Sequence, residues 1–293
     1  MKSVSLRAFC KINLCLEVLG RREDGYHELA TIFQAISLAD VVTVETRDES
    51  VIELAVPGGG APEDRSNLCW MAAETYREHR GWPTGVSMTL RKAVPSGAGL
   101  GGGSSDAAAV LMGLAQIDDR PPRWEELSQL AKDLGADVPF FLMSGAALGV
   151  GRGDDLTSLP EMPSCRIVLT RPDLTISTAG AYSMLSEDDF TDGSRTRKMA
   201  EALERGALLR EIAPHVYNGF SRALTHRWPL LAELSARLSS AGASAAQITG
   251  SGSAVFGLFD DEDEARSMAK QLSDEGLWVR IAEPAPCGAA IIE

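Results

Sequence analysis

The sequence of 293 residues is short of basic residues, histidine and cysteine, and each shortage excludes a class of protein. Lys and Arg total 28 against 41 Asp and Glu, a formal charge of -13, which argues against a general electrostatic grip on nucleic acid or on an anionic membrane. The histidines, at positions 27, 79, 215 and 226, include no pair with the spacing of a zinc site. The five cysteines are odd in number and scattered, as expected of buried thiols in a reducing compartment. An anionic ligand must therefore be held by local groups.

The sequence also lacks a long hydrophobic run. No segment approaches the roughly 20 apolar residues of a membrane span, and the amino terminus, MKSVSLRAFCKINLCLEV, alternates apolar and polar residues where a secretion signal would carry an apolar block. Apolar residues make up 44% and charged residues 24% of the chain, as in an ordinary globular protein. We therefore predict a cytoplasmic protein with no nucleic-acid or membrane partner; its oligomeric state is not defined by the sequence.

Short strand and helix patterns alternate along the chain, as is typical of an α+β fold. Strands are predicted at 3–9, 12–19, 40–46, 51–56 and 86–92, and later at 165–170, 245–250, 253–259 and 277–282. Helices are predicted at 66–81, 104–117 and 124–134, and later at about 197–212, 228–241 and 261–275. Ser66 is the predicted N-cap of the first helix and Gly81 its stop. At this length we expect two domains, 1–160 and 161–293.

The stretch PSGAGLGGGSSDAAAVL contains a glycine-rich loop that leads into a helix. Gly97, Gly99 and Gly102 spell the G-x-G-x-x-G of dinucleotide-binding proteins, and Gly97, Gly102 and Ser104 fit a P-loop in which Gly103 replaces the lysine. The first interpretation lacks the second strand that should carry its acidic residue, and the second lacks its cation. A glycine-rich turn, followed by the free amides of a helix, still favours a phosphate; a flexible surface loop with a helix cap is the alternative.

Three segments together resemble the GHMP kinases, the superfamily that includes galactokinase, homoserine kinase and mevalonate kinase. They are FCKINLCLEVLGRREDGYHELATIFQ at 9–34, PSGAGLGGGSSDAAA, and ITGSGSAVFGLF at 248–259. Within the superfamily, KINL, GRREDGYHEL and GADVPFF are similar to the branch that acts on a CDP-linked methylerythritol. The resemblance implies a two-domain α+β fold, with a ribosomal protein S5 domain 2-like domain at 1–160 and a ferredoxin-like domain at 161–293.

The same resemblance implies a reaction. It is the transfer of the γ-phosphoryl group of ATP, with Mg2+, to the 2-hydroxyl of 4-(cytidine 5'-diphospho)-2-C-methyl-D-erythritol (CDP-methylerythritol), a step of the non-mevalonate route to isoprenoids. Lys11 and Asp137 are then the expected catalytic pair, with the lysine close to the acceptor hydroxyl and holding the aspartate ionised. From the residues alone, a solvated edge-strand lysine and a helix-cap aspartate are the alternatives.

The resemblance also implies the binding residues. ATP is expected at the glycine loop, through Pro95, Gly97, Ala98, Gly99, Leu100, Gly101, Gly102, Gly103, Ser104 and Ser105, and the two serine hydroxyls have positions suited to a phosphate or a magnesium ion. No metal ligand is assigned. The substrate is expected to contact Asn13, Tyr26, His27, Thr178, Tyr182, Gly250 and Gly252, with the tyrosine rings stacking on cytosine and the histidine hydrogen-bonding the base. A solvent-facing turn at DGYHE and a tight turn at GSGS are the ordinary alternatives.

One departure from the family pattern lies next to the lysine. Family members commonly carry Pro-Ala where this chain has Phe9-Cys10, so a thiol beside Lys11 is a candidate for alkylation.

Three other functions compete with the expected one. They are another GHMP kinase that acts on homoserine or a mevalonate derivative, a non-catalytic nucleotide sensor, and a dinucleotide oxidoreductase. The first leaves the DGYHEL turn unused, and the second needs neither Lys11 nor Asp137.

Overall fold

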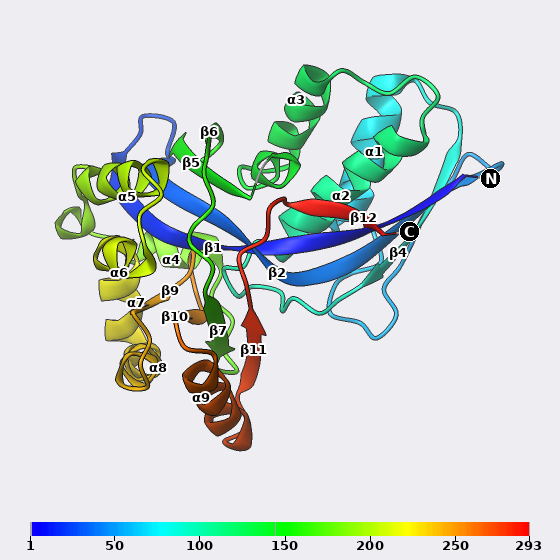
Figure 1. Cartoon of the computed structure of the whole chain (residues 1–293). Coiled ribbons are helices and arrows are strands. Elements are labelled where there is room, and N and C mark those ends of the chain that lie inside the picture. Colours follow the sequence, from blue (N-terminus) through cyan, green and yellow to red (C-terminus); the bar gives the residue numbers. More distant parts are fainter. Residues whose placement is uncertain (1, 144, 293) are drawn as a thin grey trace.

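The computed structural model describes residues 2–143 and 145–292, and it contains two β-sheets with helices packed on them (Figure 1). In this described part of the chain the first sheet has eight strands. They are β1 (Ser3–Arg21), β2 (His27–Arg47), β3 (Ile52–Ala55), β4 (Gly85–Arg91), β5 (Ala146–Gly151), β6 (Asp155–Leu159), β8 (Tyr217–Asn218) and β12 (Ala289–Ile292). Helices α1 (Leu68–Arg80), α2 (Gly102–Ile117) and α3 (Trp124–Leu134) lie together beside this sheet (Figure 1).

Strands β1 and β2 form a long antiparallel pair that reaches both halves of the molecule (Figure 1). The predicted strands 3–9 and 12–19 are one strand, with a shift in pairing register between Phe9 and Cys10. Residues 8–16 of β1 are buried without interruption: Ala8 and Phe9 pack in the core that includes helices α1 to α3, and Cys10, Ile12 and Leu14 pack in the core shared with the carboxy-terminal half. A strand buried on both faces carries few polar side chains, so Lys11 and Asn13 stand out within it.

The second sheet has the order β11-β7-β10-β9, and every neighbouring pair is antiparallel. Its strands are β7 (Arg166–Arg171), β9 (Ala245–Ile248), β10 (Val255–Phe259) and β11 (Trp278–Ala282). Helix α8 (Pro229–Ser240) precedes β9, and α9 (Glu262–Asp274) links β10 to β11, which gives the two interleaved β-α-β units of a ferredoxin-like sheet. The α+β class and the ferredoxin-like second half are therefore confirmed.

The remaining elements are short. They are α4 (Thr178–Ser183), α5 (Ser194–Glu204), α6 (Leu209–Ile212) and α7 (Ser221–Arg227), with single 3-10 turns η1 (Pro139–Leu142), η2 (Glu187–Asp189) and η3 (Ala213–His215). The predicted boundary near residue 160 stays a prediction: β6 ends at Leu159 and β7 begins at Arg166, but β8 and β12 both pair with β1. Within the described ranges, no helix combines the length and the apolar character needed to cross a membrane.

Several predicted boundaries were wrong for local reasons. The cap of α1 is Asn67, not Ser66, because the Asn67 side chain accepts a hydrogen bond from Cys69 N at 2.9 Å. The predicted helix 197–212 is divided into α5 and α6 at Gly206, which has a left-handed backbone (φ +67°). Strand β2 begins 13 residues before the predicted 40–46, and α2 begins at Gly102, two residues before the predicted 104.

Candidate active site

A cavity of about 1010 Å³ opens where the first sheet, the glycine loop and the carboxy-terminal half meet. Most residues singled out in the sequence line it, although they come from segments that are far apart in the chain. These lining residues are Lys11, Asn13, Tyr26, His27, Pro95, Gly97, Ala98, Gly99, Leu100, Gly101, Gly102, Gly103, Ser104, Asp137, Thr178, Tyr182 and Gly250. In the described chain, Ser105 and Gly252 are not among the residues that form its wall.

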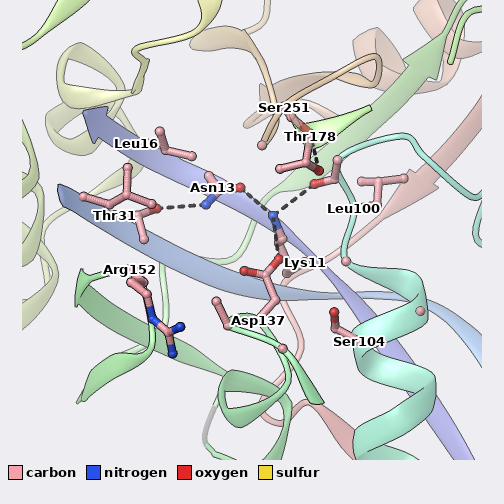
Figure 2. Close-up of a pocket in the computed structure, with 18 of the residues that line it drawn as sticks. Lys11, Asn13, Leu16, Thr31, Leu100, Ser104, Asp137, Arg152, Thr178 and Ser251 are labelled. Carbon is pink, nitrogen blue, oxygen red and sulfur yellow. Dashed lines mark hydrogen bonds and ion pairs between the residues drawn. The ribbon is translucent and has the colours of Figure 1, made fainter. Parts of the chain in front are cut away.

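Lys11 lies at the base of the cavity with its ammonium group surrounded by oxygen atoms (Figure 2). Its Nζ donates to Asn13 Oδ1 at 2.7 Å and to Gly99 O at 3.0 Å, and it lies 3.7 Å from Asp137 Oδ2. The side chain is only 4% exposed. Burial lowers the pKa of Lys11, and the nearby Asp137 carboxylate acts in the opposite direction. The lysine is thus a buried cation next to an aspartate that faces the cavity.

Asp137 stands on the loop between α3 and η1, and its carboxylate points toward the Lys11 ammonium group (Figure 2). Its side chain is 37% exposed, so one partner is the buried lysine and the rest of the group is open to the cavity. A carboxylate in this position is within reach of a hydroxyl group bound above Lys11. The pairing of Lys11 with Asp137 that the family resemblance implied is therefore present in the structure.

Asn13 orients the lysine from the same strand. Its Nδ2 donates to Thr31 Oγ1 at 2.8 Å on β2, so its Oδ1 must face Lys11. Its backbone N–H donates to Thr249 Oγ1 at 3.0 Å, which ties β1 to the turn before β10. Thr31 and Thr249 were not predicted from the sequence, because an isolated threonine in an apolar strand carries no pattern. With both ends of its amide engaged, Asn13 has a positioning role toward Lys11 in addition to lining the cavity.

The glycine loop passes close to Lys11 and ends at the start of α2. Gly101, the residue that precedes the helix, has φ +71°, and a Cβ there would lie 3.1 Å from the Lys11 side chain. No side chain caps this helix start, so the first amides of α2 have no capping partner and the positive end of the helix faces the cavity. Ser104, in the first turn, lines the same wall (Figure 2). The expected arrangement, a glycine-rich turn before the start of a helix, is present.

Two predicted contacts need correction. The Ser105 hydroxyl is fully buried and donates to Phe9 O at 2.6 Å, so it joins α2 to β1 and does not face a phosphate or a metal. Gly252 lies against Ile176, Leu224 and Ile248 behind the cavity wall, whereas Gly250 and Ser251 line the cavity. In both cases the residue next to the predicted one in the sequence faces the ligand space.

An aromatic group forms the other end of the cavity. The rings of His27 and Tyr182 stack with centroids 4.7 Å apart, and Phe190 meets His27 edge-on at 6.1 Å. The Nε2 atom of His27 is buried and has no hydrogen-bond partner among the described residues. Burial, with a smaller contribution from Arg21, lowers the pKa of His27, which favours the neutral imidazole. Since Tyr182 already stacks on His27, a bound base cannot lie between these two rings.

Tyr26 differs from the rest of this group because 57% of it is exposed. The Arg152 guanidinium lies 5.4 Å from the centre of its ring and pairs with Asp154 at 2.5 Å. Arg152 lines the cavity and was not predicted; its sequence setting, GVGRGDD, is a glycine-bounded turn with one cation. Thr178 Oγ1 and Ser251 Oγ lie 3.3 Å apart at the opposite rim (Figure 2).

The thiol beside Lys11 is not the reactive group that the sequence indicated. Cys10 is completely buried, and burial raises the pKa of its thiol well above the ordinary value. Over residues 2–143 and 145–292, no group of three or more His, Cys, Asp or Glu side chains is arranged to hold a metal ion.

Comparison with known proteins identifies two family models in the chain. The model of the GHMP kinases N terminal domain matches residues 67–145, and the model of the GHMP kinases C terminal matches residues 199–276. A protein of Geobacter sp. (strain M21) named 4-diphosphocytidyl-2-C-methyl-D-erythritol kinase is 38% identical over 96% of this chain and 99% of its own. A protein of the same name from Gloeobacter violaceus is 38% identical over 100% of this chain and 98% of its own.

Solved structures of kinases also superpose on this chain, one with higher and one with lower sequence identity. A crystal structure of 4-(cytidine 5'-diphospho)-2C-methyl-D-erythritol kinase superposes with a TM-score of 0.82 at 37% identity, covering 96% of this chain and 99% of the other. A homoserine kinase from Cytophaga hutchinsonii superposes with a TM-score of 0.77 at 19% identity, covering 100% and 98%. The second similarity concerns the fold alone, and together with the family models it confirms the expected two-domain kinase fold.

Proposed function

Because the chain belongs to the GHMP kinases, and among them to the 4-diphosphocytidyl-2-C-methyl-D-erythritol kinases, we propose that it phosphorylates the 2-hydroxyl of CDP-methylerythritol with ATP. The observation that carries the proposal is one cavity that holds both a phosphate-binding helix start and the Lys11–Asp137 pair. Such an enzyme serves the non-mevalonate route to isoprenoids. The cytoplasmic location expected from the sequence stays a prediction.

In this proposal Asp137 and Lys11 act on the acceptor hydroxyl. The Asp137 carboxylate orients the hydroxyl and takes its proton as the oxygen attacks phosphorus, and Lys11 stabilises negative charge on that oxygen. Lys11 suits this role because Asn13 Oδ1 and Gly99 O fix its ammonium on two sides while Asp137 lies on a third. Phosphoryl transfer depends mainly on positioning and charge stabilisation, so the fixed lysine matters as much as the base.

The glycine loop and the start of α2 hold the ATP phosphates in this proposal. Between Gly97 and Gly103 the five glycines leave room for an oligophosphate beside the backbone, because the side chains of Ala98 and Leu100 are buried, and the uncapped helix start offers free amides. Magnesium, when bound, neutralises charge on the phosphates. Ser104 is the hydroxyl at the helix start that lines the cavity and would contact the ion or a phosphate, while Ser105 is committed to β1.

The cytidine end of the substrate is assigned to the aromatic group. The unpartnered His27 Nε2 is suited to a hydrogen bond with the base, and Tyr182 keeps the imidazole in place by stacking. Tyr26, which is exposed, supplies the open ring face on which cytosine stacks. A homoserine or mevalonate-type kinase has no use for these groups, so we do not favour that alternative.

The test compares acceptors. Purified protein with magnesium-ATP is offered CDP-methylerythritol, homoserine and mevalonate in parallel, ADP release is followed, and phosphorus NMR is recorded on any mixture that turns over. We expect turnover with the CDP compound alone and a new phosphomonoester signal. Turnover with another acceptor, or ATP binding without turnover on any, would contradict the proposal.

A further inference from the structure

A buried cluster of three ionisable side chains lies directly behind the glycine loop and has no part in the chemistry above. It consists of Asp40 on β2, Lys92 just after β4 and Asp106 in α2, with side chains 0%, 8% and 3% exposed. Lys92 Nζ donates to a carboxylate oxygen of Asp40 and to Asp106 Oδ2, the latter at 2.7 Å. Ionisable groups are costly to bury unless they are paired, and here Lys92 pairs with both carboxyl groups.

The cluster joins the two ends of the glycine loop. Asp40 Oδ1 accepts hydrogen bonds from the backbone N–H groups of Ala93 and, at 2.8 Å, Val94, the last residues before the loop. Asp106 stands in the second turn of α2, immediately after the loop. Lys92 therefore connects the chain that enters the loop with the helix that leaves it. Its Nζ lies only 3.4 Å from the place where a Cβ of Gly102 would be.

We propose that Asp40, Lys92 and Asp106 are positioning residues for the nucleotide. They fix both ends of the glycine loop, so that the backbone amides at the start of α2 stay directed at the phosphates. None of the three is among the residues that line the cavity in the described chain, so they act through the loop and not by contact. The inference rests on the proposed use of ATP by this loop.

Because its side chains are ionisable, the cluster should make nucleotide binding depend on pH, which a purely structural link would not do. Two carboxyl groups share one ammonium, and burial raises the pKa of Asp106 to about 8 although Lys92 opposes this. Burial works against the charge of Lys92, but the two carboxyl groups outweigh it and raise its pKa. The titratable neighbours on the other packed elements are Cys69 on α1 and Cys10 on β1, and burial raises the pKa of both thiols.

The sign of the pH effect follows from these groups. Below about pH 8, Asp106 holds a proton and adds no negative charge to the cluster. Above that pH the ionised Asp106 adds one negative charge behind a loop that receives an anion. Lys92 remains charged and the two thiols remain neutral over this range. Nucleotide affinity should fall as Asp106 ionises.

The experiment measures nucleotide affinity directly. ADP binding is determined by titration calorimetry, and KM for ATP and for CDP-methylerythritol by steady-state kinetics, on wild type, Lys92→Met and Asp106→Ala. We expect ADP affinity to fall, and KM for ATP to rise, by about 10-fold or more, as is typical when an orienting residue is lost. KM for the CDP substrate should stay within about 3-fold. Asp106→Ala keeps the Lys92–Asp40 pair and serves if Lys92→Met does not fold.

Asp118→Asn is the matched control. Asp118 caps the opposite end of the same helix and is bonded to Tyr76 at 3.1 Å and Arg80 at 3.4 Å. Its loss should lower the melting temperature without changing ADP affinity. If Asp118→Asn raised KM for ATP as much as Asp106→Ala does, the effect of the cluster would be explained by general stabilisation of α2, and the inference would be overturned.

The pH profile uses Asp106→Asn, whose neutral amide copies the protonated acid. From about pH 7 to about pH 9.5, KM for ATP should rise in wild type and stay flat in the variant. Parallel profiles would overturn the assignment of this titration to Asp106. If wild type bound no ADP at all, the proposed function itself would be contradicted. If wild type, Lys92→Met and Asp106→Ala bound ADP with equal affinity, only the present inference would be overturned.

Discussion

Lys11 shows how a charged side chain is kept in the most buried part of a strand. The free-energy cost of removing an ammonium group from water is offset only where fixed oxygen atoms replace the water. Here Asn13 Oδ1 and Gly99 O accept hydrogen bonds, and Asp137 adds the opposite charge at 3.7 Å. Because Thr31 and Thr249 hold Asn13, the lysine has one preferred position. The buried site therefore holds a cation at the wall of the cavity, next to Asp137.

Asp137→Asn tests the other half of this pair. The amide keeps the shape of the side chain but cannot take a proton, so we expect kcat to fall by about 100- to 10,000-fold, with ADP affinity within about 3-fold of wild type. Asp133→Asn is the control, since this carboxylate lies four residues earlier and is held by Gln129 Nε2 at 2.9 Å. Turnover of Asp137→Asn near the wild-type rate, measured by ADP release, would refute a role for this carboxylate in the transfer.

His27→Phe separates base recognition from packing. Phenylalanine preserves the stack on Tyr182 but removes the unpartnered Nε2, so the hydrogen bond assigned to the base is lost. A buried partner left unpaired costs about 1 to 3 kcal/mol, which corresponds to a rise in KM for CDP-methylerythritol of about 5- to 150-fold. KM for ATP serves as the internal control and should not move. An equal rise in both KM values would assign His27 to the general structure of the cavity.

At the scale of elements, the glycine loop and the turn before β10 are locked together by backbone contact. Ala254 N donates to Ala98 O at 3.1 Å, and Lys11 N donates to Leu100 O at 2.9 Å. Gly99 lies between these bonds with φ +76°, and a Cβ there would collide with the carbonyl oxygen of Thr249. The loop thus touches both the first sheet and the carboxy-terminal half, and its shape depends on both.

Gly99→Ala should break this contact, and Gly206→Ala is the matched control. Gly206 also has a positive φ, +67°, but its Cβ would meet no atom within 4 Å. The control should lose about 1 to 2 kcal/mol of stability from backbone strain alone. Gly99→Ala should lose about 1 to 3 kcal/mol more from the collision, and its KM for ATP should rise. Equal unfolding free energies for the two variants in urea titrations would contradict the close contact.

The same elements explain what the sequence allowed us to predict. Helices with clear periodicity and glycine stops, such as α1 and α3, were found nearly to the residue, and the glycine loop was recognised from its composition and from the family resemblance. The first half of β2 was missed, because a strand buried on both faces has no alternation of polar and apolar residues. The sequence did not predict that the Ser105 side chain points into the core. Adjacent residues of a helix point in different directions, so which of two neighbouring serines faces the cavity depends on where α2 begins. The buried cluster was invisible because Asp40 and Lys92 are 52 positions apart and meet only in the fold.

At the scale of the whole molecule, the cavity is a product of both halves. Its wall takes Lys11 and Asn13 from β1, the glycine loop from the first half, and Tyr182 and Gly250 from the second. The long β1 strand carries this arrangement, because it pairs with β2 along most of its length and with β8 and β12 from the carboxy-terminal part. Unfolding of either half should therefore abolish nucleotide binding and substrate binding together.

The reactivity of the thiols reports whether both halves of the molecule are folded. Each of the five cysteines, all within the described residues, is a free thiol, and Cys10, Cys15, Cys69 and Cys165 are buried. Burial raises the pKa of Cys15 and of Cys165 to about 12, and it raises the pKa of Cys10 and Cys69 as well. Since the thiolate is the reactive form, these four groups should resist alkylation as long as the fold is intact.

Iodoacetamide labelling followed by intact-mass spectrometry makes this quantitative. We expect the native protein to gain at most one label, at the partly exposed Cys287, and to gain five only after denaturation. Burial raises the pKa of Cys287 too, so even this label should add slowly near neutral pH. CDP-methylerythritol should not change the pattern, because Cys10, although adjacent to Lys11, is closed off from the cavity by its own strand. Rapid labelling of Cys10 that the substrate suppresses would show that β1 opens at the active site, and would contradict the closed packing on which the position of Lys11 depends.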